Sequence, residues 1–198
     1  MKELLILETI SHRQKYLVRS GHFIHLRIVV KNDSVMEHII NNYHFANLQL
    51  MPPTKYVNIQ YLKKCHTLSL RGNSLVSDEI VKELKNCHTL DLSLTSITDQ
   101  SVSELKNCHT LYLSYTDITD KSVIKLKNCH TLYLNDTNIT DASVSKLKKC
   151  HTLDLSSTNI TNQGISKLVN CHTLYLCNIR GANNINKIFN ENKCIVWW

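Results

Sequence analysis

The sequence predicts an α/β solenoid, with short parallel strands on one face and short helices or 3₁₀ turns on the other. The first observation is a repeat: the tetrapeptide Cys-His-Thr-Leu occurs six times, at spacings of 21 or 22 residues. The copies begin at Cys65, Cys87, Cys108, Cys129, Cys150 and Cys171. The second is that the apolar spacing within each copy changes from the period of a strand to that of a helix. Repeats of this length must stack to bury a shared core.

The composition fits a folded domain. Of the 198 residues, 42% are hydrophobic and 20% are charged, which argues against a disordered chain. Apolar runs such as Leu4–Leu7 fall far short of the roughly 20 residues that span a bilayer. Met1-Lys2-Glu3 and the polar Ser11–Lys15 do not resemble a secretory signal. We therefore expect a cytoplasmic protein with no membrane partner.

The first half of each repeat predicts a strand. In the copy that begins at Cys108, Leu111 and Leu113 alternate with Thr110 and Tyr112. Alternation places the two leucines on one face and the other two residues on the opposite face. The leucines are therefore expected in the core, and the residue between them on the exposed strand face.

The second half predicts a short helix. In one copy, Val102 and Leu105 share a helical face, and Thr98 or Asp99 precedes them as an N-cap that accepts backbone N–H bonds. The helices are expected on the convex side of the solenoid and the parallel sheet on its concave side.

The motif Cys-x-x-Leu-x-Leu-x-x-(Thr/Asn)-x-(Ile/Leu) resembles the core of leucine-rich repeats, with Cys in the first leucine position. The asparagine position of that pattern holds Asn73, Thr95, Thr116, Thr137 and Thr158. The Ile-Thr-Asp half is similar to the cysteine-containing subclass of F-box/leucine-rich-repeat proteins, and the short uniform repeat to uncharacterised proteins of mimivirus-like giant viruses. The resemblance implies a right-handed α/β horseshoe and a viral protein that binds host or viral proteins.

The threonines at the asparagine position point inward, so they are expected to hydrogen-bond backbone groups of the turn. An unpaired polar group there would cost about 1–3 kcal/mol.

The chain divides into four parts of one solenoid domain: an N-terminal cap, two degenerate repeats, six regular repeats and a C-terminal cap fragment. Their predicted bounds are 1–22, 23–64, 65–193 and 194–198. The degenerate repeats are seen in Phe23-x-x-Leu26-x-Ile28 and Phe45-x-x-Leu48-x-Leu50.

Three interpretations of the N-terminus stay open. Ser11–Arg19 as a capping helix is favoured; the others are a further degenerate strand at Leu5–Leu7 and a remnant of an F-box module. At the other end, Ile185–Phe189 predicts a helix, and Trp197 and Trp198 are expected to shield the last core.

The repeated cysteines are expected to be reduced thiols in the core. No two cysteines have the close spacing of a zinc site, so we predict no metal and no cofactor. The histidine after each cysteine forms a second column, in which adjacent strands would stack the rings about 4.8 Å apart. We favour simple stacking over a metal-binding or pH-sensing stripe.

A lysine stands two residues before most of the cysteines, and the formal net charge is +7. The column comprises Lys63, Lys85, Lys106, Lys127 and Lys148. A solvated edge is the favoured interpretation; an acidic protein partner and nucleic acid are the alternatives.

The most informative positions vary where the repeat is otherwise uniform. The position between the two leucines and the position three residues further on are expected on the concave face or its edge. They supply our predicted partner-binding residues, Tyr112, Tyr115, Tyr133, Tyr175, Asp91, Asp136 and Asp154. Exposed tyrosines are typical of interfaces. The alternative is drift among tolerated residues, with tyrosines packing to stabilise the strands.

No nucleophile–base pair, phosphate loop or carboxylate pair emerges, so we predict no enzyme. The predicted function is a protein-interaction scaffold that binds its partner on the concave face. The alternatives are the substrate-recognition subunit of an F-box-type ubiquitin ligase, and binding of nucleic acid or an acidic partner by the lysine edge. The sequence leaves the oligomeric state and the partner's identity open.

Overall fold

Parallel strands run the length of the molecule in the computed structural model, which describes residues 27–30, 47–50, 62–63, 65–179 and 195–197. In these residues nine strands pair in chain order, each with the next, in one sheet. The strands are β1 (Arg27–Val30), β2 (Asn47–Leu50), β3 (Thr67–Ser69), β4 (Thr89–Asp91), β5 (Thr110–Tyr112), β6 (Thr131–Tyr133), β7 (Thr152–Asp154), β8 (Thr173–Tyr175) and β9 (Ile195–Trp197). Every adjacent pair is parallel.

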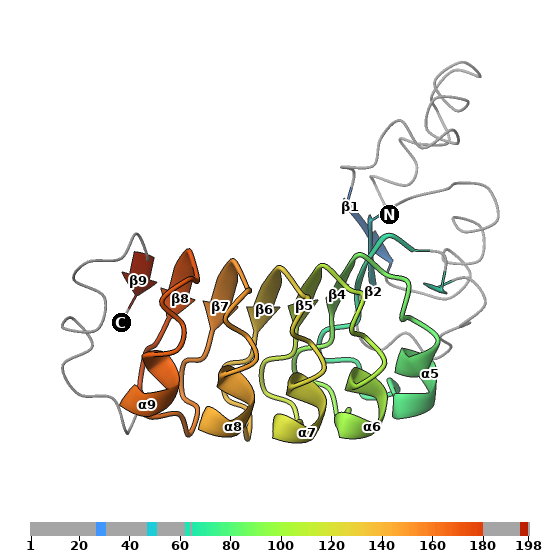
Figure 1. Ribbon diagram of the computed structural model, residues 1–198. Coiled ribbons are helices and arrows are strands. Elements are labelled where there is room, and N and C mark those ends of the chain that lie inside the picture. The colour runs from blue at the N-terminus through green and yellow to red at the C-terminus, as the bar shows by residue number, and fades with distance from the viewer. Residues whose placement is uncertain (1–26, 31–46, 51–61, 64, 180–194, 198) are drawn as a thin grey trace, which may run out of the picture.

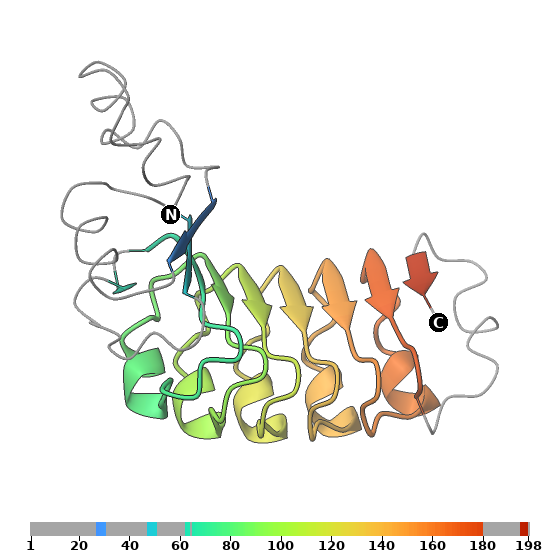
Figure 2. The ribbon, with the colours of Figure 1, turned by 180° about the vertical axis from the view of Figure 1, so that it is seen from behind.

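Short helices form the second layer, opposite the sheet. They are α5 (Asp78–Lys82), α6 (Asp99–Val102), α7 (Asp120–Val123), α8 (Asp141–Val144) and α9 (Asn162–Ile165). Figure 1 shows them in a row across from strands β4 to β8, and Figure 2 shows the same two layers from behind. The predicted fold class is confirmed.

The core lies between the two layers. In each of β3 to β8 the middle leucine is buried and its two neighbours are half-buried. In the repeat of β5, Leu111, Leu113, Ile118, Val123 and Leu126 are all 0% exposed. The change of period read from the sequence therefore places one apolar column after another in a continuous core.

The threonines at the asparagine position hydrogen-bond the turn, as predicted. Thr95, Thr116, Thr137 and Thr158 are buried, and each Oγ1 donates to the backbone O three residues earlier at 2.5–2.6 Å. Asn73 instead accepts from the N–H of Leu75 at 3.0 Å. The two residue types thus satisfy different backbone groups of the same turn.

Aspartates at the helix starts tie each repeat to the next. Asp99, the first residue of α6, accepts from Thr119 N at 2.8 Å, Thr119 Oγ1 at 2.5 Å and Ser122 Oγ at 2.6 Å. Thr98 is the residue that caps α6, by accepting from the N–H of Gln100. These bonds form a ladder, in which each aspartate accepts from the threonine of the next repeat. The pairs are Asp78 with Thr98, Asp99 with Thr119, Asp120 with Thr140, and Asp141 with Thr161.

Replacing Gly164 with serine is expected to stabilise the protein by about 0.5–1 kcal/mol. Gly164 stands where α6 and α7 have Ser101 and Ser122, whose hydroxyls donate to the preceding Asp. A Cβ at Gly164 would lie 2.2 Å from Oδ1 and 2.9 Å from Cγ of Asp141, so this carboxylate must shift while it keeps its bonds to Thr161, as Asp99 keeps its bonds to Thr119 beside Ser122. Thermal unfolding of Gly164→Ser, with Gly164→Ala as the control that lacks the hydroxyl, measures this. A Tm below wild type for Gly164→Ser would contradict it.

Strands β1, β2 and β9 extend the sheet beyond the regular repeats. Leu48 is in register with Leu68, as the motif predicts. Ile28, and not Leu26, is in register with Leu48, so the first degenerate repeat is displaced by two residues from the register that its motif predicts. At the other end Trp197 is in register with Tyr175. The proposed cap at 1–22, the helices at Ser11–Arg19 and Ile185–Phe189, and Trp198 lie outside the described residues, so these stay predictions.

Candidate functional site: a row of tyrosines on the exposed sheet

The exposed strand face carries a column of variable residues. In β3 to β8 the last strand residue is half-buried and lies beside its counterparts in register. The column reads Ser69, Asp91, Tyr112, Tyr133, Asp154 and Tyr175. Five of the seven predicted site residues therefore stand side by side on one face.

The three tyrosines of this column form a row of rings, which we call the tyrosine face (Tyr112, Tyr133 and Tyr175). Tyr112 and Tyr133 stack with ring centroids 4.6 Å apart and planes 8° apart. Tyr133 also reaches Tyr175 across the intervening β7, with centroids 6.3 Å apart and planes tilted by 31°. Aromatic pairs in such contact stabilise each other by about 0.5–1.5 kcal/mol beyond their burial.

The two aspartates in the column also fasten the turn that follows each strand. Oδ1 of Asp91 accepts from Ser93 N at 3.0 Å, and Oδ1 of Asp154 accepts from Ser156 N at 3.0 Å. Ser69 Oγ donates to the other oxygen of Asp91 at 3.2 Å. The two predicted orienting charges therefore have a structural role as well.

The environment of Tyr112 and Tyr133 disfavours their ionised phenols. Burial raises the pKa of Tyr112, and the charge of Asp91 adds to it. Burial likewise raises the pKa of Tyr133, with contributions from the adjacent tyrosines and Asp154. These two hydroxyls therefore remain hydrogen-bond donors at neutral pH.

Tyr115 and Asp136 lie beside the face rather than on it. Both are turn residues with positive φ, of 56° and 54°. Tyr115 is 52% exposed, and its hydrogen bond to Asp136 raises the pKa of its phenol. The turn at the carboxyl ends of the strands thus forms a separate second column, and Gly72, with φ 66° at the same position, is the sequence signal for it.

Most repeats have a residue other than glycine at this turn, and its left-handed backbone destabilises the turn. Leu94, Tyr115, Asp136, Ser157 and Asn178 all have φ between 54° and 59°. A left-handed backbone costs a residue with a side chain about 1 kcal/mol or more. The N–H groups of the first four donate to the next repeat, Leu94 N to Ser114 O at 2.9 Å for example, which holds the turn in place.

The histidines stack, as predicted. Rings of His66, His88, His109, His130, His151 and His172 follow one another with centroids 4.4–4.6 Å apart and planes 11–14° apart. Partial burial, together with the neighbouring rings, lowers the pKa of His88, His109 and His151. In the part of the chain that the structure describes, no group of three or more His, Cys, Asp or Glu is arranged to hold a metal ion.

The repeated cysteines are buried, as predicted. Cys65, Cys87, Cys108, Cys129 and Cys150 are free thiols and at most 6% exposed. Burial raises the pKa of Cys129 to about 12, with a contribution from Cys108. These thiols stay protonated and act as small apolar groups of the core. Cys177, off this column, is half-buried.

Comparison with known proteins agrees with this geometry. A family model described as "Leucine Rich repeat" matches residues 151–169. No curated protein matches the chain. No helix within the described ranges has the length and apolar character needed to cross a membrane.

Three solved structures with the same fold come from bacteria. An internalin C2 of Listeria monocytogenes is 24% identical with a TM-score of 0.60, over 87% of this chain and 77% of its own. An internalin (inlF) of the same organism is 18% identical with a TM-score of 0.58, over 80% and 55% of the two chains. A leucine-rich-repeat protein of Leptospira interrogans is 23% identical with a TM-score of 0.58, over 96% and 52%. This chain thus spans about half the length of the last two.

Identities below 25% establish a shared fold and no more. The repeat motif, the stacked strand–turn–helix units and the family match over residues 151–169 together show that the chain has the leucine-rich-repeat fold.

Proposed function

We propose that this protein is a non-enzymatic interaction scaffold that binds a protein partner on its tyrosine face. The observation that carries the proposal is the row of three contacting tyrosine rings on the exposed side of a parallel sheet. Tyrosine is enriched among the residues that dominate binding energy, because its large ring buries much area and loses little rotamer freedom.

The platform beneath the rings is rigid, which lowers the entropy lost on binding. The strand backbones are paired on both sides, and the residues after each strand continue the ladder, as Leu113 N donates to Tyr133 O at 2.9 Å. Because Tyr112 and Tyr133 already stack, their ring positions are set before a partner arrives.

The charges around the face favour a partner with basic side chains. Asp91 and Asp154 lie in the same column, and Asp136 lies in the turn beside it. One oxygen of Asp154 holds its turn, and both oxygens of Asp91 accept hydrogen bonds, from Ser93 N and Ser69 Oγ, so each aspartate brings a hydrogen-bonded carboxyl group to the site. Lysine or arginine of a partner would pair with them at the rim, which sets orientation more than affinity.

The combined change of Tyr112, Tyr133 and Tyr175 to alanine is expected to weaken partner binding by about 100-fold or more, since each anchor contributes about 1–2 kcal/mol. Affinity capture from cell lysate with mass spectrometry identifies partners, and titration calorimetry with the purified partner gives Kd. The matched control changes three exposed residues of the opposite, helical layer to alanine: Gln100, Lys121 and Gln163.

Thermal unfolding of the same variants distinguishes binding from strand packing. A tyrosine variant that loses stability but retains every partner would show that the rings only stabilise the sheet. The tyrosine-to-phenylalanine triple variant keeps the stack and removes the hydroxyls, so it measures what hydrogen bonding adds to binding.

The narrower assignments are part of the same proposal. The motif's resemblance to F-box/leucine-rich-repeat proteins supports a ubiquitin-ligase recognition subunit, and its resemblance to giant-virus proteins supports a viral protein acting in the host cytoplasm. An adapter and a cullin among the captured partners would favour the ligase. Their absence from a capture that does recover tyrosine-dependent partners would count against it.

A further inference from the structure

One edge of the molecule has more basic than acidic residues only in its later repeats. The residues that follow the helices read Glu83-Leu-Lys-Asn and Glu104-Leu-Lys-Asn in two repeats. In the next three they read Lys125-Leu-Lys-Asn, Lys146-Leu-Lys-Lys and Lys167-Leu-Val-Asn. The edge patch, as we call it, comprises Lys125, Lys127, Lys146, Lys148, Lys149 and Lys167, all of them exposed.

The glutamates and lysines at this edge occupy the same structural position. Glu104 N donates to Ser101 O at 3.0 Å, Lys125 N to Ser122 O at 3.0 Å and Lys146 N to Ser143 O at 2.9 Å. The buried leucine that follows is also equivalent in each repeat. The exchange of Glu for Lys therefore reverses the charge without changing the fold.

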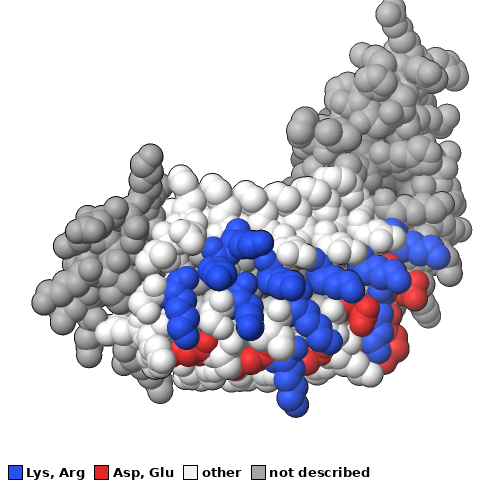
Figure 3. All heavy atoms as spheres, viewed as in Figure 1, with Lys and Arg blue, Asp and Glu red and all other residues white. Residues whose placement is uncertain are grey.

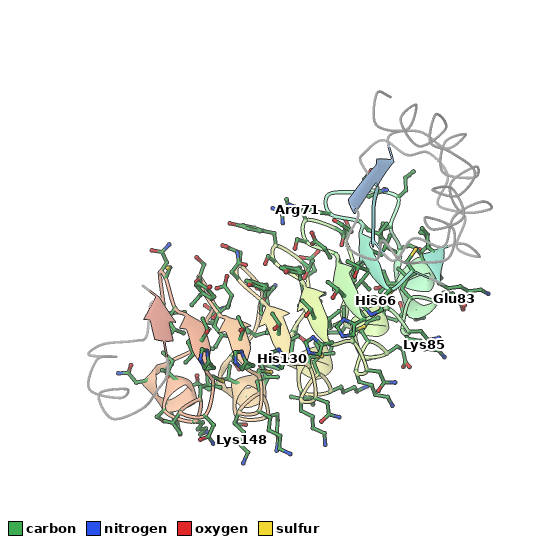
Figure 4. The ribbon with its side chains drawn as sticks, turned by 90° about the horizontal axis from the view of Figure 1, so that it is seen from above. His66, Arg71, Glu83, Lys85, His130 and Lys148 are labelled. Carbon is green, nitrogen blue, oxygen red and sulfur yellow. The ribbon has the colours of Figure 1, made fainter. Side chains whose placement is uncertain are left out.

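The patch forms a continuous surface. Figure 3 shows the lysines as a band between the two layers, with acidic side chains among them at the α5 end and also below the band toward the α9 end. In Figure 4, Lys148 lies on the same edge as Lys85 and Glu83, and Arg71 lies at the opposite edge. In most repeats the exposed histidine comes three residues after the lysine that precedes the cysteine. The histidines therefore lie next to the lysine band, on the same side of the strands.

Carboxylates close to the patch in sequence are already engaged. Asp120 accepts from Thr140, and Asp141 accepts from Thr161 at 2.8 Å and 2.5 Å. Hydrogen bonds from neutral groups fix these carboxylates within the helical layer but leave their charge, so the patch is an excess of lysines over the acidic side chains near it rather than a surface free of negative charge.

We propose that the edge patch binds the phosphodiester backbone of nucleic acid. Six lysines in three stacked repeats match a regularly charged polyanion, whose affinity comes from release of its counterions. Leu126 and Leu147 between the lysines are 0% exposed and so cannot anchor a protein partner, while Ile124 and Val169 beside the patch are 40% and 37% exposed. Lysines of this kind contact phosphate and read no sequence, so binding is expected to be independent of base sequence.

Fluorescence anisotropy with a labelled 20-bp DNA duplex, at salt from 50 to 200 mM, tests the proposal. Each lysine that contacts phosphate adds about 1 to the slope of log affinity against log salt. The double variant Lys125→Glu and Lys146→Glu is expected to weaken binding at least tenfold and to reduce the slope by about 2. The matched control, Lys85→Glu and Lys106→Glu, makes the same change in net charge and is expected to weaken binding by threefold or less.

The gain-of-charge variant Glu83→Lys and Glu104→Lys extends the patch by two repeats and is expected to tighten binding. Equal weakening by the two lysine variants would overturn the proposal, because it would show a response to net charge alone. So would no duplex binding at 50 mM salt, or tighter binding to polyglutamate or to phosphatidylserine vesicles than to the duplex. Circular dichroism confirms that each variant is folded.

Discussion

Replacing Leu132 with alanine is expected to lower the free energy of unfolding by about 3 kcal/mol and to broaden the unfolding transition. Leu132 is 0% exposed in β6, in register with Leu111 and Leu153 on either side. The substitution removes a large apolar side chain and leaves a cavity that the stacked repeats can close only in part. Guanidinium-induced unfolding followed by circular dichroism measures both effects.

Whether the unfolding transition broadens depends on where in the stack the altered repeat lies. Each repeat contacts its neighbours, so a weakened central repeat uncouples the two halves of the solenoid. Leu174→Ala is the matched control, because Leu174 is also 0% exposed but lies in β8, at the end of the regular repeats. A central variant that unfolds as sharply as the control, with an equal loss of stability, would contradict uncoupling.

Replacing Asp120 with alanine is expected to lower the free energy of unfolding by about 2 kcal/mol, because hydrogen bonds to a charged acceptor contribute about this much. Its carboxylate accepts from Thr140 N at 2.9 Å, Thr140 Oγ1 at 2.6 Å and Ser143 N at 3.3 Å. Asp117→Ala is the control, since Asp117 is exposed in the same repeat. Asp120→Asn keeps one acceptor oxygen and is expected to recover part of the loss. Thermal unfolding compares the three variants.

The pH dependence identifies the carboxylate as the cause. Burial alone would raise the pKa of Asp120, but hydrogen bonds from Ser143 and Thr140 outweigh it and lower the pKa. A carboxyl group whose pKa falls on folding stabilises the protein above its unfolded pKa of about 4, and this contribution is lost as the pH falls through the lowered value. The gap between wild type and Asp120→Ala should therefore shrink below pH 4. A gap that is constant down to pH 2 would assign the effect to packing.

Much of the architecture could be predicted because the signals are local. Alternation in Thr-Leu-x-Leu and helical spacing in Val-x-x-Leu depend only on residues a few positions apart, and the repeat spacing then aligns each strand with the next. The burial of Leu111 and Cys108, the stacking of the histidines and the hydrogen bond of Thr116 all follow from that alignment.

The candidate site was predicted less completely. The column with Tyr112 and Tyr133 follows from alternation, whereas for Tyr115 and Asp136 the sequence left open whether they lie on the concave face or at its edge. Their position depends on a left-handed turn, and five of its six residues are not glycine, so residue type gives little sign of the backbone conformation.

By itself, the sequence determined the repeat, the order of strand and helix within it, and which residues form each column, because these depend on spacing along one chain. Only the tertiary structure determined which side chains of neighbouring repeats contact one another. Tyr133 meets Tyr175 across the strand of Asp154, and Asp99 gives its carboxylate to Thr119 of the next repeat rather than to its own helix. Such contacts depend on the distance and rotation between stacked repeats, and residues twenty or more positions apart meet only when the core that joins them has formed.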